Sequence, residues 1–205
     1  MNRIAPQTRA RVALPCALLL AWLFTMAAPA AAGDAEGAPS PTNGRLRVGD
    51  IAPDFTLTSI DGAPLCLGNC LGDKPTLVVF WSYFCFPCQK EIPDLQKVYE
   101  ELGAEQFAVM SISLDGPEYE DKLRPFLDKH GITFPTVYDN MTEEFFEVAE
   151  KYGVVGTPTS FLLDASGRVR FMHLGRLDAD ILKGLVRSAK DQAFCSEITK
   201  PEARK

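Results

Sequence analysis

The sequence predicts an α/β fold built on a mixed central sheet. Short apolar runs, of which residues 76–81 (TLVVFW) are the clearest, alternate with segments whose apolar residues recur at helical spacing. A run that is apolar at every position is typical of a strand buried on both faces. A hairpin near the C-terminus would add an antiparallel edge, so parallel and antiparallel strands are expected in one sheet.

The first half of the folded region is expected to contain a hairpin, this buried strand and a helix. Residues 54–67 have the alternation of a hairpin that turns at Asp61-Gly62. A helix is predicted from about Cys88 to Leu102, because its apolar residues fall on one stripe. Pro93 lies inside this helix and predicts a kink.

The second half repeats the alternation. We expect a strand over residues 107–115, a helix over 118–131 interrupted at Pro125, a strand over 134–139, a helix over 142–153, a hairpin over 159–175 and a last helix from about Asp178 to Ala193. The last hairpin turns around Ser166-Gly167, where small and flexible residues interrupt the apolar pattern.

Residues 1–32 are predicted to be a secretory signal peptide. Three arginines and no acid open the chain, residues 13–28 are apolar, and Ala30 and Ala32 occupy the positions that a signal peptidase reads. The apolar run is near the lower limit for spanning a bilayer, so an uncleaved membrane anchor is the alternative. Either reading places the rest of the chain in the periplasm or another extracytoplasmic compartment.

One folded domain is expected over residues 46–190. The chain has 205 residues, enough for one domain with its own core. Residues 33–45 are rich in Gly, Pro and Ala and are predicted to be a flexible linker, and residues 191–205 a C-terminal tail. Without the three N-terminal arginines, the formal net charge falls from −6 to about −9. An acidic domain without a basic stripe argues against a nucleic-acid partner.

Cysteines in an oxidising compartment tend to form disulfides or to act as redox catalysts. Those that follow the predicted signal peptide are Cys66, Cys70, Cys85, Cys88 and Cys195. Because their number is odd, at least one cannot pair within the chain.

Cys85 and Cys88 have the placement of a redox-active pair. Cys85 follows the buried strand by a few residues, and Cys88 lies in the first turn of the predicted helix. Free backbone N–H groups and the helix dipole stabilise a thiolate there, and a thiolate is the species that attacks disulfides. Two intervening residues let the second sulfur close on the first.

Other roles fit this pair less well. A structural zinc site would need a second pair of Cys or His ligands at similar spacing, and haem attachment would need a histidine where Gln89 follows Cys88. A permanent disulfide of this spacing would constrain only a short loop. We therefore predict dithiol chemistry that uses no metal and no cofactor.

Residues 80–88 (FWSYFCFPC) closely resemble the FWAxWCxPC segment of the thioredoxin fold. Residues 48–62 (VGDIAPDFTLTSIDG), 85–93 (CFPCQKEIP) and 152–169 (YGVVGTPTSFLLDASGRV) resemble the TlpA and ResA-like branch of exported thiol-disulfide oxidoreductases. The resemblance covers about residues 46–190. It implies a thioredoxin-like three-layer fold with a mixed central sheet, an N-terminal β-hairpin and a central αβ insertion.

The resemblance also implies roles for individual residues. Cys85 would be the nucleophile and Cys88 the resolving cysteine. Pro158 would be a cis-proline that faces the pair and leaves the backbone of Thr157 free to bind an extended substrate strand. Phe86 is unusual between the cysteines, and as an exposed apolar residue it is expected to contact substrate. Trp81 is placed at the same surface, mainly as packing and a shield.

Glu91 is a candidate proton acceptor. It lies one helical turn after Cys88, so its side chain can point back toward the pair. In the ResA-like branch a glutamate at this position is implicated in proton transfer, whereas thioredoxins usually carry a buried aspartate where this chain has Val79. The alternative is a surface glutamate that simply favours a helix near its start.

Cys66 and Cys70 are not explained by the resemblance. Four residues apart on a helical turn, their Cα atoms would lie about 6 Å apart, within disulfide range. A structural disulfide is the first interpretation and a second redox pair the alternative. Cys195, after the last helix, is an alternative partner for either.

The sequence therefore predicts an exported thiol-disulfide oxidoreductase that reduces disulfides of client proteins. By resemblance, the clients are of the cytochrome c maturation or metal-site assembly type, and an upstream thiol donor, for which a membrane-embedded protein is a candidate, supplies electrons. One alternative is a peroxiredoxin-like peroxidase, since residues 52–57 (APDFTL) also open that branch, although its PxxxTxxC motif is absent. The other is a client-binding or chaperone module without turnover.

Overall fold

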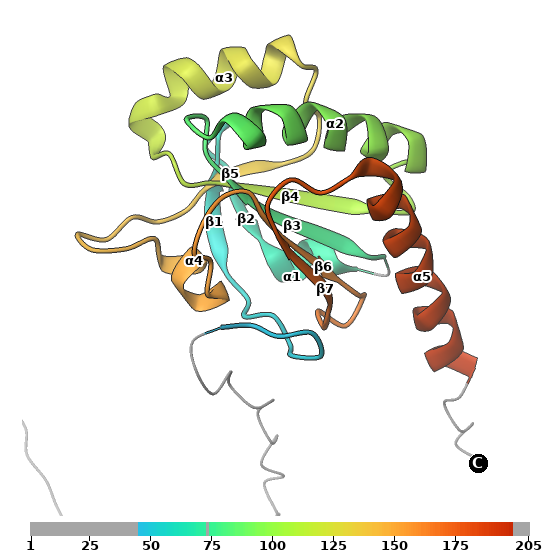
Figure 1. Ribbon diagram of the computed structural model, residues 1–205. Coiled ribbons are helices and arrows are strands. Elements are labelled where there is room, and N and C mark those ends of the chain that lie inside the picture. The colour runs from blue at the N-terminus through green and yellow to red at the C-terminus, as the bar shows by residue number, and fades with distance from the viewer. Residues whose placement is uncertain (1–44, 73, 199–205) are drawn as a thin grey trace, which may run out of the picture. The chain divides into compact units, whose positions relative to one another are not determined.

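The computed structural model describes residues 45–72 and 74–198, with side chains described as far as residue 190 (Figure 1). The predicted signal peptide, most of the linker and the end of the predicted tail lie outside these residues. One mixed sheet forms the centre, in the strand order β2-β1-β5-β4-β3-β6-β7. The strands are β1 (Thr56–Ser59), β2 (Pro64–Cys66), β3 (Thr76–Trp81), β4 (Ala108–Ser113), β5 (Thr136–Tyr138), β6 (Thr159–Leu163) and β7 (Val169–Leu174).

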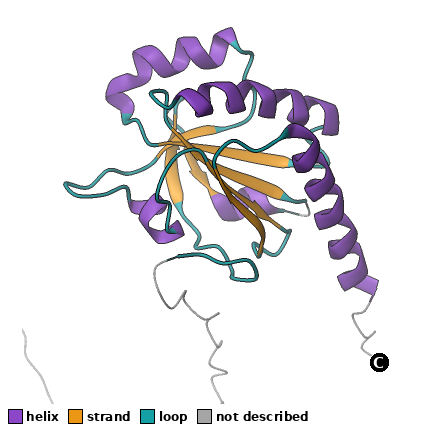
Figure 2. Ribbon diagram, in the orientation of Figure 1, coloured by secondary structure: helices purple, strands orange, loops and turns teal. Residues whose placement is uncertain are grey.

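Helices cover both faces of this sheet, which confirms the predicted three-layer thioredoxin-like architecture (Figures 1 and 2). Helices α2 (Phe86–Leu102), α3 (Glu120–Lys129) and α5 (Ala179–Ile198) lie on one face, and α1 (Leu67–Leu71) and α4 (Glu147–Tyr152) on the other. A short 3₁₀ helix over Pro117–Tyr119 precedes α3. Among the described helices, none combines the length and the apolar character that crossing a membrane requires.

Strand β3 is an interior strand of the sheet and is buried on both faces, as its continuous apolar run predicts. It pairs in parallel with β4 and antiparallel with β6, and all its residues are buried. Val78 and Phe80 point to the face that α1 and α4 cover, whereas Val79 and Trp81 point to the face that α2 and α5 cover. The chain leaves the carboxyl end of β3 at Trp81 and reaches Cys85, the N-cap of α2, four residues later.

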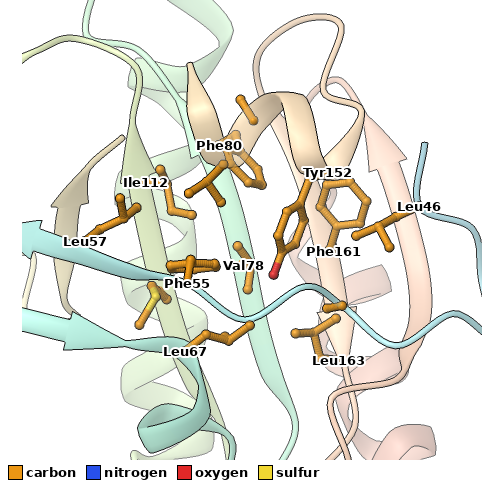
Figure 3. Packing of buried hydrophobic residues seen from close by; sticks show 14 of the residues in the cluster. Leu46, Phe55, Leu57, Leu67, Val78, Phe80, Ile112, Tyr152, Phe161 and Leu163 are labelled. Carbon is orange, nitrogen blue, oxygen red and sulfur yellow. The ribbon is translucent and has the colours of Figure 1, made fainter. Parts of the chain in front are cut away.

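An aromatic cluster holds the α1 and α4 face together (Figure 3). The ring of Tyr152 lies 5.3 Å from the rings of both Phe80 and Phe161, measured between centroids. The buried Tyr152 hydroxyl donates a hydrogen bond of 2.9 Å to the carbonyl oxygen of Pro53. This hydrogen bond ties α4 to the segment before β1. It also satisfies the hydroxyl, whose burial without a partner would cost free energy.

The helix boundaries differ from the prediction in three places. Helix α3 runs through Pro125 without interruption, because Leu123 and Leu127 on either side of it are buried against the core. Helix α4 spans only the second half of residues 142–153, because Thr142 instead holds a turn by accepting the N–H of Phe145 at 3.1 Å. Helix α5 continues to Ile198, so Cys195 lies within this helix and not after it as predicted.

Candidate active site

Cys85 and Cys88 are joined by a disulfide at the carboxyl end of β3, with 5.2 Å between their Cα atoms. Cys85 is the N-cap residue of α2, and its sulfur accepts the backbone N–H of Cys88 at 3.3 Å. Cys85 is half-buried, whereas Cys88 has no exposed surface. In the reduced protein the same N–H group and the helix dipole would stabilise a thiolate at Cys85.

The loop that leads into Cys85 is held by Asp115, a residue that the sequence analysis did not single out. Its buried carboxylate accepts the Ser82 hydroxyl and the Tyr83 N–H, both at 2.6 Å, and the Ser113 hydroxyl at 3.0 Å. The sequence did offer a signal for Asp115, because it is an acid at the end of the apolar run over residues 107–115. Asp115 thus fixes the backbone from which the nucleophilic sulfur is presented.

The Thr157-Pro158 peptide bond is cis, as predicted, and lies against the cysteine pair. The sulfur of Cys85 is 3.4 Å from the carbonyl oxygen of Thr157. Pro158 is buried and Thr157 is half-buried, so Thr157 is partly accessible beside the cysteine pair. Residues 72 positions apart in the sequence therefore meet at one surface.

Glu91 is buried, with 4% of its surface exposed, which excludes the alternative of a surface glutamate. Its carboxylate accepts the Ser160 hydroxyl at 3.4 Å and the Leu177 N–H at 3.3 Å. Burial raises the pKa of Glu91 to about 7, although these two hydrogen bonds and the charge of Arg176 oppose the shift. A carboxyl group with this pKa can gain and lose a proton near neutral pH.

The carboxylate of Glu91 contacts the sheet next to Val79, the position where thioredoxins usually carry a buried aspartate. Ser160 on β6 is the Cα partner of Val79 on β3, so the side chain that Glu91 contacts is the lateral neighbour of Val79. A cavity of about 10 Å³ next to Glu91, lined also by Asp94 and Leu177, is close to the size that one water needs.

Trp81 packs in the core, as expected, but the prediction that it also contacts substrate is wrong. Its side chain has no exposed surface, and its indole N–H donates to the Ser111 hydroxyl at 3.2 Å. The reason is the alternation along β3, which points the indole into the layer beneath α2 and α3. The exposed aromatic residues next to the disulfide are Phe84, 59% exposed, and Phe86, 67% exposed.

Cys66 and Cys70 are free thiols, so the structure does not contain the predicted disulfide between them. The sulfur of Cys66 donates instead to the carboxylate of Asp54 at 3.5 Å. The Thr76 hydroxyl, at the start of β3, donates to the carbonyl oxygen of Cys70, which places these thiols at the other end of β3 from Cys85. That separation of about 17 Å along the strand argues against direct electron relay within one molecule. A disulfide between Cys195 and either of these cysteines stays a prediction, because the structure describes side chains only as far as residue 190.

Metal ligands are not clustered in the part of the chain that the structure describes. No group of three or more His, Cys, Asp and Glu side chains among these residues has the spacing to hold an ion.

Comparison with known proteins gives a consistent result. Residues 48–172 match the model of the AhpC/TSA family. The thiol-disulfide oxidoreductase ResA of Geobacillus thermodenitrificans is 31% identical over 148 residues, which are 71% of this chain and 79% of that protein. The thioredoxin-like protein YneN of Bacillus subtilis is 31% identical over 64% of this chain and 74% of its own length.

Solved structures agree with these relatives. The crystal structure of a putative thiol:disulfide interchange protein DsbE from Chlorobium tepidum has a TM-score of 0.61 and 29% identity. The match covers 71% of this chain and 99% of that chain.

Proposed function

Because this chain belongs to the AhpC/TSA family and is a thiol-disulfide oxidoreductase of the ResA and DsbE type, we propose that it reduces client disulfides through Cys85 and Cys88. The observation that carries the proposal is the asymmetry of the pair. Cys85 caps α2, is partly accessible and faces Thr157, whereas Cys88 is fully buried behind it. An accessible nucleophile backed by a buried second thiol suits a two-step exchange.

In the first step the Cys85 thiolate attacks one sulfur of the client disulfide. The Cys85–client bond forms, the client S–S bond breaks, and the other client sulfur leaves as a thiolate that takes up a proton. Attack requires the thiolate, and the N-terminal position of Cys85 on α2 favours that state. The client strand would lie along the accessible backbone of Thr157.

In the second step Cys88 attacks the sulfur of Cys85 and releases the second client thiol. Two electrons have then moved from the protein dithiol to the client, and the Cys85–Cys88 disulfide remains. Cys88 must lose its proton first, and the Glu91 carboxylate, three residues further along α2, is the group we assign to accept it. An upstream dithiol reductant would reduce the disulfide again.

The residues between the cysteines support the reducing direction. Phe86 and Pro87 bring no positive charge or ionisable group that would lower the thiol pKa of Cys85 further. A thiol of very low pKa is ionised in the reduced protein. This stabilises the reduced form and makes the dithiol pair a strong oxidant. The resemblance to exported relatives extends the proposal to an extracytoplasmic protein whose clients belong to cytochrome c maturation or metal-site assembly.

Insulin reduction tests the proposal. With a dithiol donor present, the protein should accelerate insulin precipitation, and Cys85→Ser should remove the acceleration. Cys70→Ser is the matched control, because Cys70 is a free thiol at the other end of β3, and it should retain the activity. A Cys85→Ser protein that reduces insulin at the wild-type rate would show that the assignment is wrong.

A further inference from the structure

A groove of about 470 Å³ lies beside the disulfide, between the start of α2 and helix α3. Phe86 and Lys90 of α2 line one side, and Lys122, Phe126 and Lys129 of α3 line the other. Phe126 anchors its base, because the Phe126 ring packs against the buried Trp81 at 5.8 Å and against Tyr83 at 5.9 Å between centroids. The groove is therefore attached to the same loop that presents Cys85.

Three lysines give this groove a charge opposite to that of the whole chain. The ammonium groups of Lys90, Lys122 and Lys129 are exposed, and none forms an ion pair with a residue that the structure describes. Asp121 is the acid in the lining. In a chain of formal net charge −6, such a cluster of unpaired cations is a local exception.

Two of these lysines lie over the aromatic residues that flank the disulfide. The ammonium of Lys90 is 4.5 Å from the ring centroid of Phe86. The ammonium of Lys122 is 5.4 Å from the centroid of Phe84 and 5.1 Å from that of Tyr119. These contacts hold the charges next to exposed apolar surface instead of letting them extend into solvent. A ligand that matches the groove combines carboxylates with apolar side chains.

We propose that this basic-aromatic groove binds an acidic segment of the client polypeptide that flanks the client disulfide. The inference rests on the proposed function, since the groove is useful only if a client disulfide is brought to Cys85. Carboxylates of the segment would pair with Lys90, Lys122 and Lys129, while its apolar side chains would cover Phe86. Charge complementarity of this kind speeds encounter and selects among clients.

A polypeptide fits the groove better than an anionic membrane does. The basic residues line a concave surface that adjoins the disulfide, and Asp121 within the lining would oppose a uniformly anionic surface. A client segment that continues from a bound cysteine reaches the groove without any further component.

Peptide reduction provides the test. Two disulfide-bonded peptides of equal length are compared, one with glutamates and one with glutamines beside the same cysteines, using the intact protein and a dithiol donor. We expect a KM about 3- to 10-fold lower for the glutamate peptide, because each exposed ion pair contributes modestly. The preference should disappear near 1 M salt, where the Debye length is about 3 Å.

Reversing the charge of groove lysines tests whether the preference for the glutamate peptide arises in the groove. Lys122→Glu/Lys129→Glu should abolish or invert the preference for the glutamate peptide. Arg45→Glu/Arg47→Glu is the matched control: both arginines are exposed near the start of β7, at the end of the sheet away from Cys85, and the preference should remain. Binding of a cysteine-free glutamate peptide, measured by calorimetry, should weaken in the first variant alone.

Several results would overturn the inference. Equal KM values for the two peptides would reject the groove as a docking site while leaving the proposed reductase intact. Reduction of neither peptide would reject both. Binding to vesicles containing phosphatidylglycerol through Lys122 and Lys129, without a preference for the glutamate peptide, would assign the groove to a membrane instead.

Discussion

The hydroxyl of Ser160 donates a hydrogen bond to the carboxylate of Glu91 across 3.4 Å, joining β6 to α2 in the buried layer behind the disulfide. Ser160 lies two residues after the cis-proline Pro158, and Glu91 lies three residues after Cys88. The contact therefore fixes a titratable group between the two segments that form the site. Because burial raises the pKa of Glu91 to about 7, this group changes charge in the pH range where Cys88 must react.

Glu91→Gln should slow the resolving step. The carboxylate is ionised above about pH 7 and can then take the Cys88 proton, whereas the amide cannot. At pH 8 we expect the release of client thiol from the mixed disulfide to fall by about 100-fold, the low end of general-base effects. Stopped-flow measurement across pH 5 to 9 should show a rise with an apparent pKa near 7 in the wild type. An identical profile in the variant would remove this role from Glu91.

The same residue should make stability depend on pH. The folded protein binds the Glu91 proton more tightly than the unfolded chain does, because the folded pKa of about 7 exceeds the ordinary value of 4.5. This group therefore stabilises the fold fully below pH 4.5, and the contribution is lost as the pH rises through 7. The loss is about 3 kcal/mol in the free energy of unfolding. Urea unfolding at pH 5 and pH 8 measures it.

Glu91→Gln is the control for that measurement, since glutamine has no proton to lose. The variant should lose less stability than the wild type between pH 5 and pH 8, when both are compared in the oxidised form. Parallel curves for the two proteins would mean that Glu91 is not the group that titrates.

Asp115→Ala should lower activity more than stability alone explains. The substitution removes the acceptor for the Ser82 hydroxyl and the Tyr83 N–H, so the loop before Cys85 loses its anchor. We expect an unfolding free energy lower by about 2 kcal/mol, since buried donors are left unpaired. At a temperature where the variant is fully folded, kcat for insulin reduction should still drop about tenfold. Wild-type kcat in the folded variant would contradict the positioning role.

Substitution of Trp81 should affect stability, whereas substitution of Phe86 should affect client binding. Trp81→Ala removes a fully buried side chain and should cost about 3 to 5 kcal/mol of unfolding free energy. Phe86→Ala removes an exposed ring and should change that free energy by about 0.5 kcal/mol or less, while the KM for protein clients rises. Thermal unfolding and client titration of both variants provide the comparison. A destabilised Phe86→Ala with unchanged KM would show that Phe86 is structural.

Local patterns in the sequence were sufficient for most of the fold. The apolar run of β3, the turn at Gly62 and the glycine that ends α4 each act over a few residues, and the structure has each where it was expected. The first half of residues 142–153 was misassigned because one hydroxyl, that of Thr142, favours a turn over a helix. Helix propensity alone does not include such a side-chain bond.

The site was less predictable, because its environment is built by residues distant in sequence. Spacing predicted Cys85, Cys88 and Glu91 at the start of one helix, and the structure has Cys85 as the N-cap of α2 and the other two residues within it. Burial raises the pKa of Glu91, and the hydrogen bonds from Leu177 and Ser160 oppose the shift; only the assembled sheet and the segment before α5 supply this environment. Trp81 is the last residue of β3, and its burial follows from the layer of helices that packs on that face of the sheet.

The central claim is that Cys85 makes the covalent bond to the client and Cys88 breaks it. Trapping with Cys88→Ser tests it most directly, because a nucleophile without its resolving partner should accumulate as a mixed disulfide. The variant is mixed with a disulfide-bonded peptide, alkylated, digested without reduction and mapped by mass spectrometry. Our account expects the peptide on Cys85. An adduct on Cys66 or Cys70, or no adduct while the wild type turns the peptide over, would contradict it.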